Sequence, residues 1–167
     1  MTNEEKKLVE DLMKNSISKS EFLKLFQIDI KKDNDYLLSL LEKAYNENNA
    51  DDIEDILFIS FSFSLFSKIF VNILNKLIVE EWHYKHEDIA RILQKLKDPK
   101  SVEYLYEATL SSYEYLDYDE SYALAVKCIW ALGDINNEFA IEKLKLLSKS
   151  DNTIIKENAI NQLNRSH

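Results

Sequence analysis

Glycine and proline are almost missing from this chain of 167 residues, which contains one of each. A protein of this length carries on average about 12 glycines and 8 prolines. β-Sandwiches, barrels and dinucleotide-binding α/β folds depend on turn glycines, and phosphate-cradling loops depend on clustered glycines. The scarcity therefore disfavours all of these classes and favours long helices joined by tight turns.

Cysteine is equally scarce, because Cys128 is the single one in the chain. One thiol builds neither an internal disulfide nor a thiolate metal cluster. The most apolar run, residues 56–67, is shorter than the ~20 residues that a membrane-spanning helix needs. Residues 1–14 lack the apolar core of a signal peptide. We therefore expect a cytoplasmic protein with no membrane contact, and we assign it no cofactor.

Positive charge is also in short supply, since 30 acidic residues outnumber 21 Lys and Arg and leave a net charge of -9. The basic residues are scattered rather than gathered in a patch. Nucleic acids and anionic lipids repel such a surface. The partner that this charge suits is a basic protein.

Apolar residues recur at three- and four-residue spacing through most of the chain, which is the pattern of helices that bury one face. In the N-terminal half, helices are expected to begin near Ser20, near Asp33 or Asp35, and at residues 51–52. Residues 58–64 alternate Phe or Ile with Ser, which is also a strand pattern, but an isolated strand has no pairing partner. We expect a helix there, a further helix over residues 65–81, and an all-α fold.

The second half contains an internal repeat. Residues 93–105 align without gaps with residues 132–144, 39 positions further on, and residues 159–163 match residues 128–132 as a partial third copy. Each unit reads as a helix, a tight turn and a second helix, and such hairpins become stable by stacking. The sequence predicts a single domain over residues 1–167, irregular and helical over 1–81 and built of stacked helix pairs over 82–165.

These residues carry a family resemblance. The run Cys128-Ile129-Trp130-Ala131-Leu132-Gly133-Asp134-Ile135, with Ala140, Ile141, Leu144 and Leu147, resembles HEAT repeats of the bacterial HEAT-like type. Gln94 in place of the usual glycine, and a proline at only one of two turns, depart from that pattern. The resemblance implies a right-handed, armadillo-type α-solenoid of antiparallel helix pairs.

A narrower resemblance concerns function. Residues 81–90, 115–119 and 127–132 look like a group of bacterial HEAT-repeat proteins that are suspected to be immunity partners of polymorphic toxins. The likeness implies a non-catalytic protein that neutralises a toxin domain by binding it. A general protein-interaction scaffold is an open alternative, because both functions need only a helical binding surface.

In a stack of helix pairs, the connections between successive pairs lie along one edge. Two of these connections place aromatic residues among carboxylates, and that mixture suits a Lys- and Arg-rich protein surface. The alternative is a solvated acidic turn whose tyrosines pack back onto the helix ends. The predicted partner-binding residues are Glu81, Trp82, Tyr84, Tyr115, Asp117, Tyr118 and Asp119.

His83, His86 and Glu87 leave a metal-dependent enzyme open as a further alternative. The two histidines are three residues apart and would share a helix face. One HEAT-repeat family, the deoxyhypusine hydroxylases, holds two irons with a His-Glu pair in each of several repeats. Only His86-Glu87 matches that pattern, and the position 39 residues later carries Ala125-Val126. We therefore favour helix capping for this segment and assign neither a metal site nor a catalytic residue.

Overall fold

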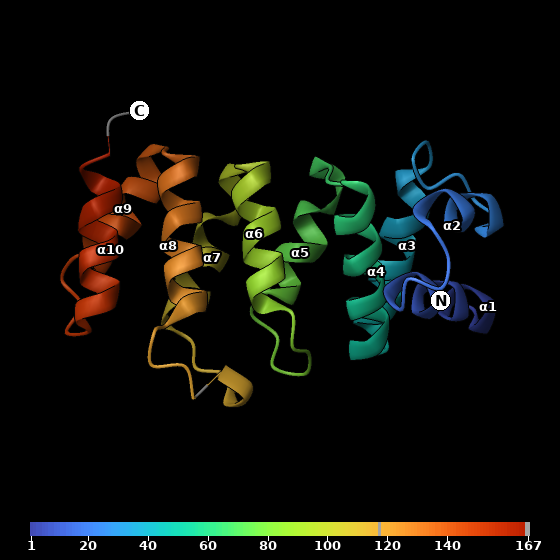
Figure 1. Ribbon diagram of the computed structural model, residues 1–167. Coiled ribbons are helices and arrows are strands. Elements are labelled where there is room, and N and C mark those ends of the chain that lie inside the picture. Colours follow the sequence, from blue (N-terminus) through green and yellow to red (C-terminus); the bar gives the residue numbers. More distant parts are fainter. Residues whose placement is uncertain (117, 166–167) are drawn as a thin grey trace. The chain divides into compact units, whose positions relative to one another are not determined.

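The computed structural model describes residues 1–116 and 118–165. Over these residues the chain forms ten α-helices and no β-strand (Figure 1), so the predicted all-α class is confirmed. None of the described helices combines the length and apolar character needed to cross a bilayer. The helices are α1 (Asn3–Met13), α2 (Lys19–Leu25), α3 (Asn34–Asn46), α4 (Ala50–Phe63), α5 (Val71–Leu77), α6 (His86–Leu96), α7 (Val102–Leu110), α8 (Ala123–Ile135), α9 (Glu138–Leu147) and α10 (Thr153–Leu163).

The chain divides into two compact units, residues 1–67 and residues 68–167, which we call unit 1 and unit 2. The sequence predicted one domain whose character changes at residue 82. In the structure residues 68–81 already belong to unit 2, because α5 packs against α6 and α7.

Unit 1 consists of α1 to α4, and its mainly aliphatic core includes a small group of stacked aromatic rings. Phe22 stacks on Phe26 and on Phe63, with ring centroids 5.1 and 5.4 Å apart. Residues 58–63 lie in α4, so the helical interpretation of the alternating segment is correct. Helix α2 begins after Ser18, whose hydroxyl accepts from the N–H of Glu21, and not at Ser20 as predicted.

The segment 65–81 is less helical than predicted. Only a 3₁₀ turn at Lys68–Phe70 and the seven-residue α5 form within it. Ser64 ends α4 in the left-handed region at φ 56°, which turns the chain before the apolar residues continue. Apolar periodicity alone shows which face is buried and does not show where the backbone turns.

Unit 2 arranges α6 to α10 in two layers (Figure 1). Helices α6, α8 and α10 lie side by side in one layer, and α7 and α9 lie behind them. Helix α8 is central, because it packs against each of the other four. Its buried residues include Ala125, Cys128, Ile129 and Leu132.

The two copies of the sequence repeat have the same turn. Lys97 ends α6 and Asn136 ends α8, both in the left-handed region at φ 49°. The next residue caps the helical segment after the turn: Asp98 Oδ1 accepts from the N–H of Lys100 at 3.0 Å, and Asn137 Oδ1 accepts from that of Ala140 at 2.8 Å. The alignment at an offset of 39 residues thus extends to the backbone conformation of the turn.

Polar pairs join the copies along their length. Lys127 Nζ lies 2.5 Å from Glu87 Oε2, and Lys143 Nζ lies 2.8 Å from Glu103 Oε2. The Gln94 amide donates to Asp134 at 2.8 Å. Each of these pairs spans 40 residues, one more than the alignment offset, so equivalent positions of the two copies lie beside one another.

Candidate functional site

Two connections of unit 2 meet at one end of its helices. Residues 78–85 join α5 to α6, residues 111–122 join α7 to α8, and both project from the lower end of the helices in Figure 1. The rings of Tyr84 and Tyr115 bring them together edge-to-face, with centroids 5.3 Å apart. We call the described residues of these two connections the aromatic edge.

A cluster of four rings, three of them buried, holds the two connections in place. His83 and His86 stack with centroids 4.2 Å apart, and the Tyr113 ring lies 3.8 Å from that of His86. The Tyr113 hydroxyl donates to the carbonyl oxygen of Ile78 at 2.8 Å. The fourth ring, Tyr115, comes from the same connection as Tyr113, so the cluster draws on both connections.

Each histidine uses both ring nitrogens. His83 Nε2 lies 2.7 Å from the carbonyl oxygen of Leu77, and His83 Nδ1 accepts from the N–H of Lys85 at 3.1 Å. His86 Nε2 lies 2.6 Å from the carbonyl oxygen of Glu80, and His86 Nδ1 lies 2.8 Å from the Tyr115 hydroxyl. A carbonyl oxygen only accepts, which assigns the proton to Nε2 in both rings.

The cluster is uncharged at neutral pH. Both histidines are fully buried, and burial lowers the pKa of His83. Burial, reinforced by the neighbouring His83, lowers the pKa of His86 to about 4. Burial also raises the pKa of Tyr113 and of Tyr115 to about 12. Neutral rings with satisfied hydrogen bonds are a structural device, and here they fix the conformation of the aromatic edge.

This geometry gives the metal-site alternative no support. The lone pair on Nδ1 of each histidine is already occupied, by a backbone N–H in His83 and by a tyrosine hydroxyl in His86. Glu87 turns instead to Lys127. Within residues 1–116 and 118–165, no group of three or more His, Cys, Asp or Glu side chains is placed to hold a metal ion.

The structure sorts the predicted partner-binding residues into exposed and supporting ones. Tyr84 is 65% exposed and Tyr118 is 82% exposed, and Glu81 is exposed as well. Trp82 and Tyr115 are half-buried: the Trp82 indole N–H donates to Glu80 at 3.2 Å, and Tyr115 belongs to the ring cluster. Asp117 lies outside the described residues.

Asp119 has a local structural role that sequence reasoning missed. Its carboxylate accepts from the N–H of Ala123 at 2.8 Å and from the N–H and hydroxyl of Ser121 at 3.0 and 2.5 Å. The hydroxyl and the two N–H groups lower the pKa of Asp119. Asp119 therefore caps the first turn of α8 and keeps its negative charge at the aromatic edge.

One further exposed aromatic residue of the edge was not predicted. Tyr122 is 46% exposed and stands directly before α8 in the left-handed region, at φ 53°. A tyrosine seldom adopts that conformation. Asp119 lies three residues earlier in the chain and accepts a hydrogen bond from the N–H of Ala123. This bond holds the turn in which Tyr122 takes the left-handed conformation. Nothing in the sequence pattern distinguishes Tyr122 from its neighbours.

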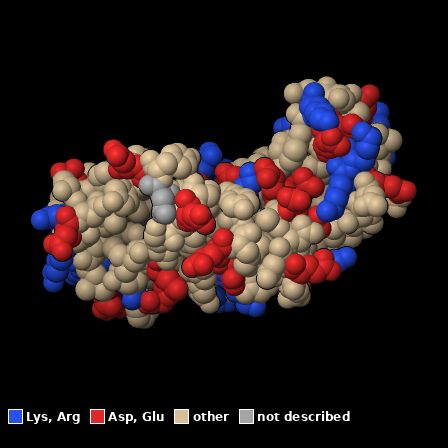
Figure 2. All heavy atoms as spheres, turned by 90° about the horizontal axis from the view of Figure 1, so that it is seen from below, with Lys and Arg blue, Asp and Glu red and all other residues tan. Residues whose placement is uncertain are grey.

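Carboxylates surround these rings. Glu81, Glu114 and Glu120 are exposed on the aromatic edge, whose one described basic residue is Lys85. Figure 2 looks onto this end of unit 2 and shows acidic groups scattered among uncharged surface there. The edge is therefore negative as well as aromatic.

Cys128 is not part of this site. Its side chain is fully buried in α8, and burial raises the pKa of the thiol to about 12. We expect an aromatic disulfide reagent to modify Cys128 at least about 1,000-fold more slowly in the native chain than in urea, because reaction must await unfolding. Rates within tenfold of one another would show an accessible thiol.

Comparison of the chain with protein-family models, with curated proteins and with solved structures finds no match. Its function is therefore inferred from the residues of the aromatic edge and from the sequence resemblance.

Proposed function

We propose that this chain is a non-catalytic protein-binding module whose aromatic edge binds a basic protein. The observation that carries the proposal is the pair of exposed rings, Tyr84 and Tyr118, set among carboxylates on two connections that hydrogen bonds of the buried His86 join. Aromatic anchors supply most of the energy of protein interfaces.

We further propose that residues 82–165 form a HEAT-like α-solenoid. The shared turn at Lys97-Asp98 and Asn136-Asn137 supports this proposal, as do the pairs that join positions 40 residues apart. A solenoid presents successive connections along one edge, which gives a binding surface wider than a single hairpin provides.

Charge supports a basic partner. Apart from Lys85, the described ionised side chains of the aromatic edge are carboxylates, and the whole chain carries a net charge of -9. Complementary charge speeds encounter and orients the partner, while the rings provide affinity once they are covered. A cationic side chain can also lie over the face of Tyr84 or Tyr118.

The partner that we propose is a bacterial toxin domain, which makes the chain an immunity protein. This step rests on the resemblance of residues 81–90, 115–119 and 127–132 to suspected immunity proteins. It requires that a toxin be encoded beside this chain and that binding abolish the toxin's activity. A partner that is bound without loss of any activity would instead indicate a scaffold.

The test is a photo-crosslink followed by a measured affinity. A benzophenone amino acid at Tyr118 should crosslink a basic protein in cells that contain both genes, and the complex is then rebuilt from purified proteins. Tyr84→Ala should weaken that complex about 30-fold, the effect of losing one hot-spot side chain. Tyr84 is mostly exposed, so the variant should fold normally.

Phe139 provides the matched control. It is an aromatic residue that is 63% exposed and lies at the start of α9. Helix α9 follows the C-terminal end of α8, whereas the aromatic edge adjoins the N-terminal end of α8. Phe139→Ala should leave the affinity unchanged within about twofold. Equal loss of affinity in Tyr84→Ala and Phe139→Ala, or no loss in Tyr84→Ala, would refute the assignment of the interface to this edge.

A further inference from the structure

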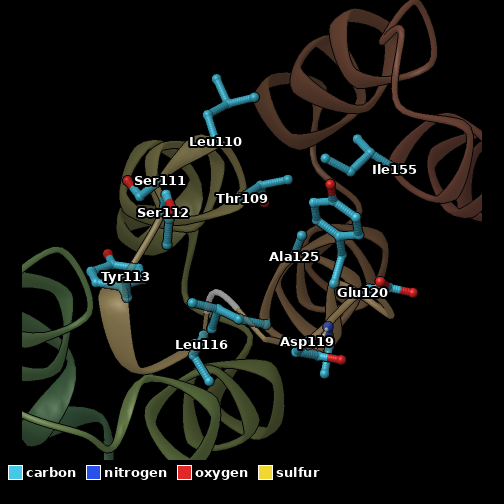
Figure 3. A pocket seen from close by; sticks show the side chains of 14 residues that line it. Thr109, Leu110, Ser111, Ser112, Tyr113, Leu116, Asp119, Glu120, Ala125 and Ile155 are labelled. Carbon is cyan, nitrogen blue, oxygen red and sulfur yellow. Dashed lines mark hydrogen bonds between the residues drawn. The ribbon is translucent and has the colours of Figure 1, made fainter.

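A cavity lies beside the aromatic edge, between the end of α7 and the start of α8. Its volume is about 440 Å³, which is within the size range of sites that enclose a small ligand or a large side chain. Figure 3 shows residues of α7, of the connection 111–122, of α8 and of α10 around it. All of its lining residues belong to unit 2. We call it the α7–α8 cavity.

The walls of the α7–α8 cavity are mixed, with more apolar than polar surface. Leu116, Leu124, Ala125 and Ile155 contribute carbon surface from three different parts of unit 2. Leu110, the last residue of α7, also lines the cavity although it is 58% exposed, and Tyr122 lines it at 46% exposed. Two large apolar side chains thus border the cavity without being covered by the chain itself.

The charges that line the α7–α8 cavity have one sign. Of the lining residues that the structure describes, Asp119 and Glu120 are acidic and none is Lys, Arg or His. The start of α8 is the one lining feature of positive polarity, and the N–H of Ala123 there already donates to Asp119. The end of α7 adds the negative pole of a helix.

These features together select a particular occupant. An anionic group would meet two carboxylates, and a purely apolar side chain would bury the Asp119 carboxylate without giving it a counter-ion. A side chain with an apolar stem and a cationic head satisfies both the walls and the charges. The adjacent carboxylates and the Tyr122 ring favour Arg over Lys. The planar guanidinium of Arg can donate two parallel hydrogen bonds to a carboxylate, and it stacks on aromatic rings.

We propose that the α7–α8 cavity receives an arginine side chain of the basic protein partner. This inference rests on the proposed function, which supplies the partner, and it names the part of that partner that enters the chain. The arginine stem contacts Leu110 and Ile155, and its guanidinium faces Asp119 and Glu120. The exposed rings of Tyr84 and Tyr118 bind around this anchor.

The test uses three short peptides that differ at one position. N-acetylated, C-amidated Gly-Arg-Gly, Gly-Lys-Gly and Gly-citrulline-Gly are titrated into the full chain in 0.15 M salt, with the ¹H–¹⁵N spectrum as the readout. At that salt concentration charges beyond about 8 Å are screened. The arginine peptide should move the amide signals of residues 109–125 and of Ile155 in a saturable way. It should bind about fivefold more tightly than the uncharged citrulline peptide.

Two exposed glutamates of the same connection separate the cavity from the general charge of the edge. Glu120 lines the cavity and Glu114 does not, and both are exposed. Glu120→Gln should weaken binding of the arginine peptide about threefold, and Glu114→Gln should leave it unchanged. Equal effects of the two variants, equal binding of arginine and citrulline peptides, or signals that move elsewhere would overturn the cavity assignment. Tighter binding of the lysine peptide would overturn the choice of arginine.

The outcome is distinguishable from that of the proposed function. If the peptide fails to bind but Tyr84→Ala weakens the reconstituted complex, the arginine anchor is wrong and the aromatic edge stands. If the peptide binds in the cavity but Tyr84→Ala leaves the complex unchanged, the cavity binds arginine and the aromatic edge is not the interface.

Discussion

Lowering the pH from 7.5 to 4.5 should destabilise unit 2 through His86. The pKa of His86 is about 4 in the folded chain and ordinarily 6.5, so the unfolded chain binds more protons across this interval. The stabilisation is complete above the ordinary pKa and is lost as the pH falls towards 4. A difference of this size corresponds to about 3 kcal/mol, of which most is lost by pH 4.5.

Urea unfolding followed by tryptophan fluorescence measures the loss of stability of unit 2. The two tryptophans, Trp82 and Trp130, both lie in unit 2. His86→Gln keeps a side chain able to donate and accept hydrogen bonds but removes the titration. We expect the variant to be less stable than the wild type at pH 7.5 and to lose less stability on acidification. Parallel profiles for the two proteins would show that His86 is not buried as a neutral ring.

Asp55 should change stability with pH in the direction opposite to His86. Burial raises its pKa to about 6, so protonation favours the folded state as the pH falls through that value. Asp55 lies in unit 1, which contains no tryptophan, so the fluorescence profile should not report it. A second probe of unit 1, such as amide exchange of α4, should show protection that holds or increases between pH 7 and 5 after correction for the intrinsic rate.

The helical class followed directly from composition and spacing, because the near absence of glycine and proline acts through local backbone chemistry. The similarity of residues 93–105 to residues 132–144 was also visible in the sequence, and the structure gives the two segments the same turn conformation. Local capping was harder to place: Ser18 and Ser20 have the same side chain, and only the position of Glu21 three residues after Ser18 completes the reciprocal pair.

The ring cluster could not be read from the sequence, because it forms between segments that are distant in the chain. His86 and Tyr115 are 29 residues apart, and their hydrogen bond exists only once α6 and α7 have packed on α8. The sequence suggested helix capping for His86. His86 is the first residue of α6, but no side chain caps this helix, and the sequence gave no sign of Tyr113 or of the carbonyl of Glu80 as neighbours of the ring.

The same limit applies to the partner-binding residues. The sequence does not distinguish an acidic residue that faces solvent from one that accepts hydrogen bonds from backbone N–H groups. Glu81 is exposed and Asp119 caps α8, although the sequence assigned both to the partner. The exposure of Tyr84 and the burial of Tyr113 depend on which ring the histidines cover, and that choice is made by tertiary packing.

The effect of Gly133→Ala on the free energy of unfolding should change sign when Gln162 is replaced by alanine. Gly133, the single glycine, lies in α8, and a Cβ atom there would stand 2.1 Å from Oε1 of Gln162 in α10. Gln162 is buried and its Oε1 accepts from Arg165 at 2.8 Å, so it is not free to move away. We expect Gly133→Ala alone to lower the free energy of unfolding by about 1 kcal/mol, because overpacking exceeds the gain in helix propensity.

In the Gln162→Ala background the obstructing atoms are gone, so the intrinsic preference of a helix for alanine over glycine remains. Gly133→Ala should then raise the free energy of unfolding by about 1 kcal/mol. Urea unfolding of the four proteins of this double-mutant cycle gives a coupling of about 2 kcal/mol, which additive sites would not show. Alanine that stabilises both backgrounds equally would mean that α8 and α10 do not approach as closely as the structure has them.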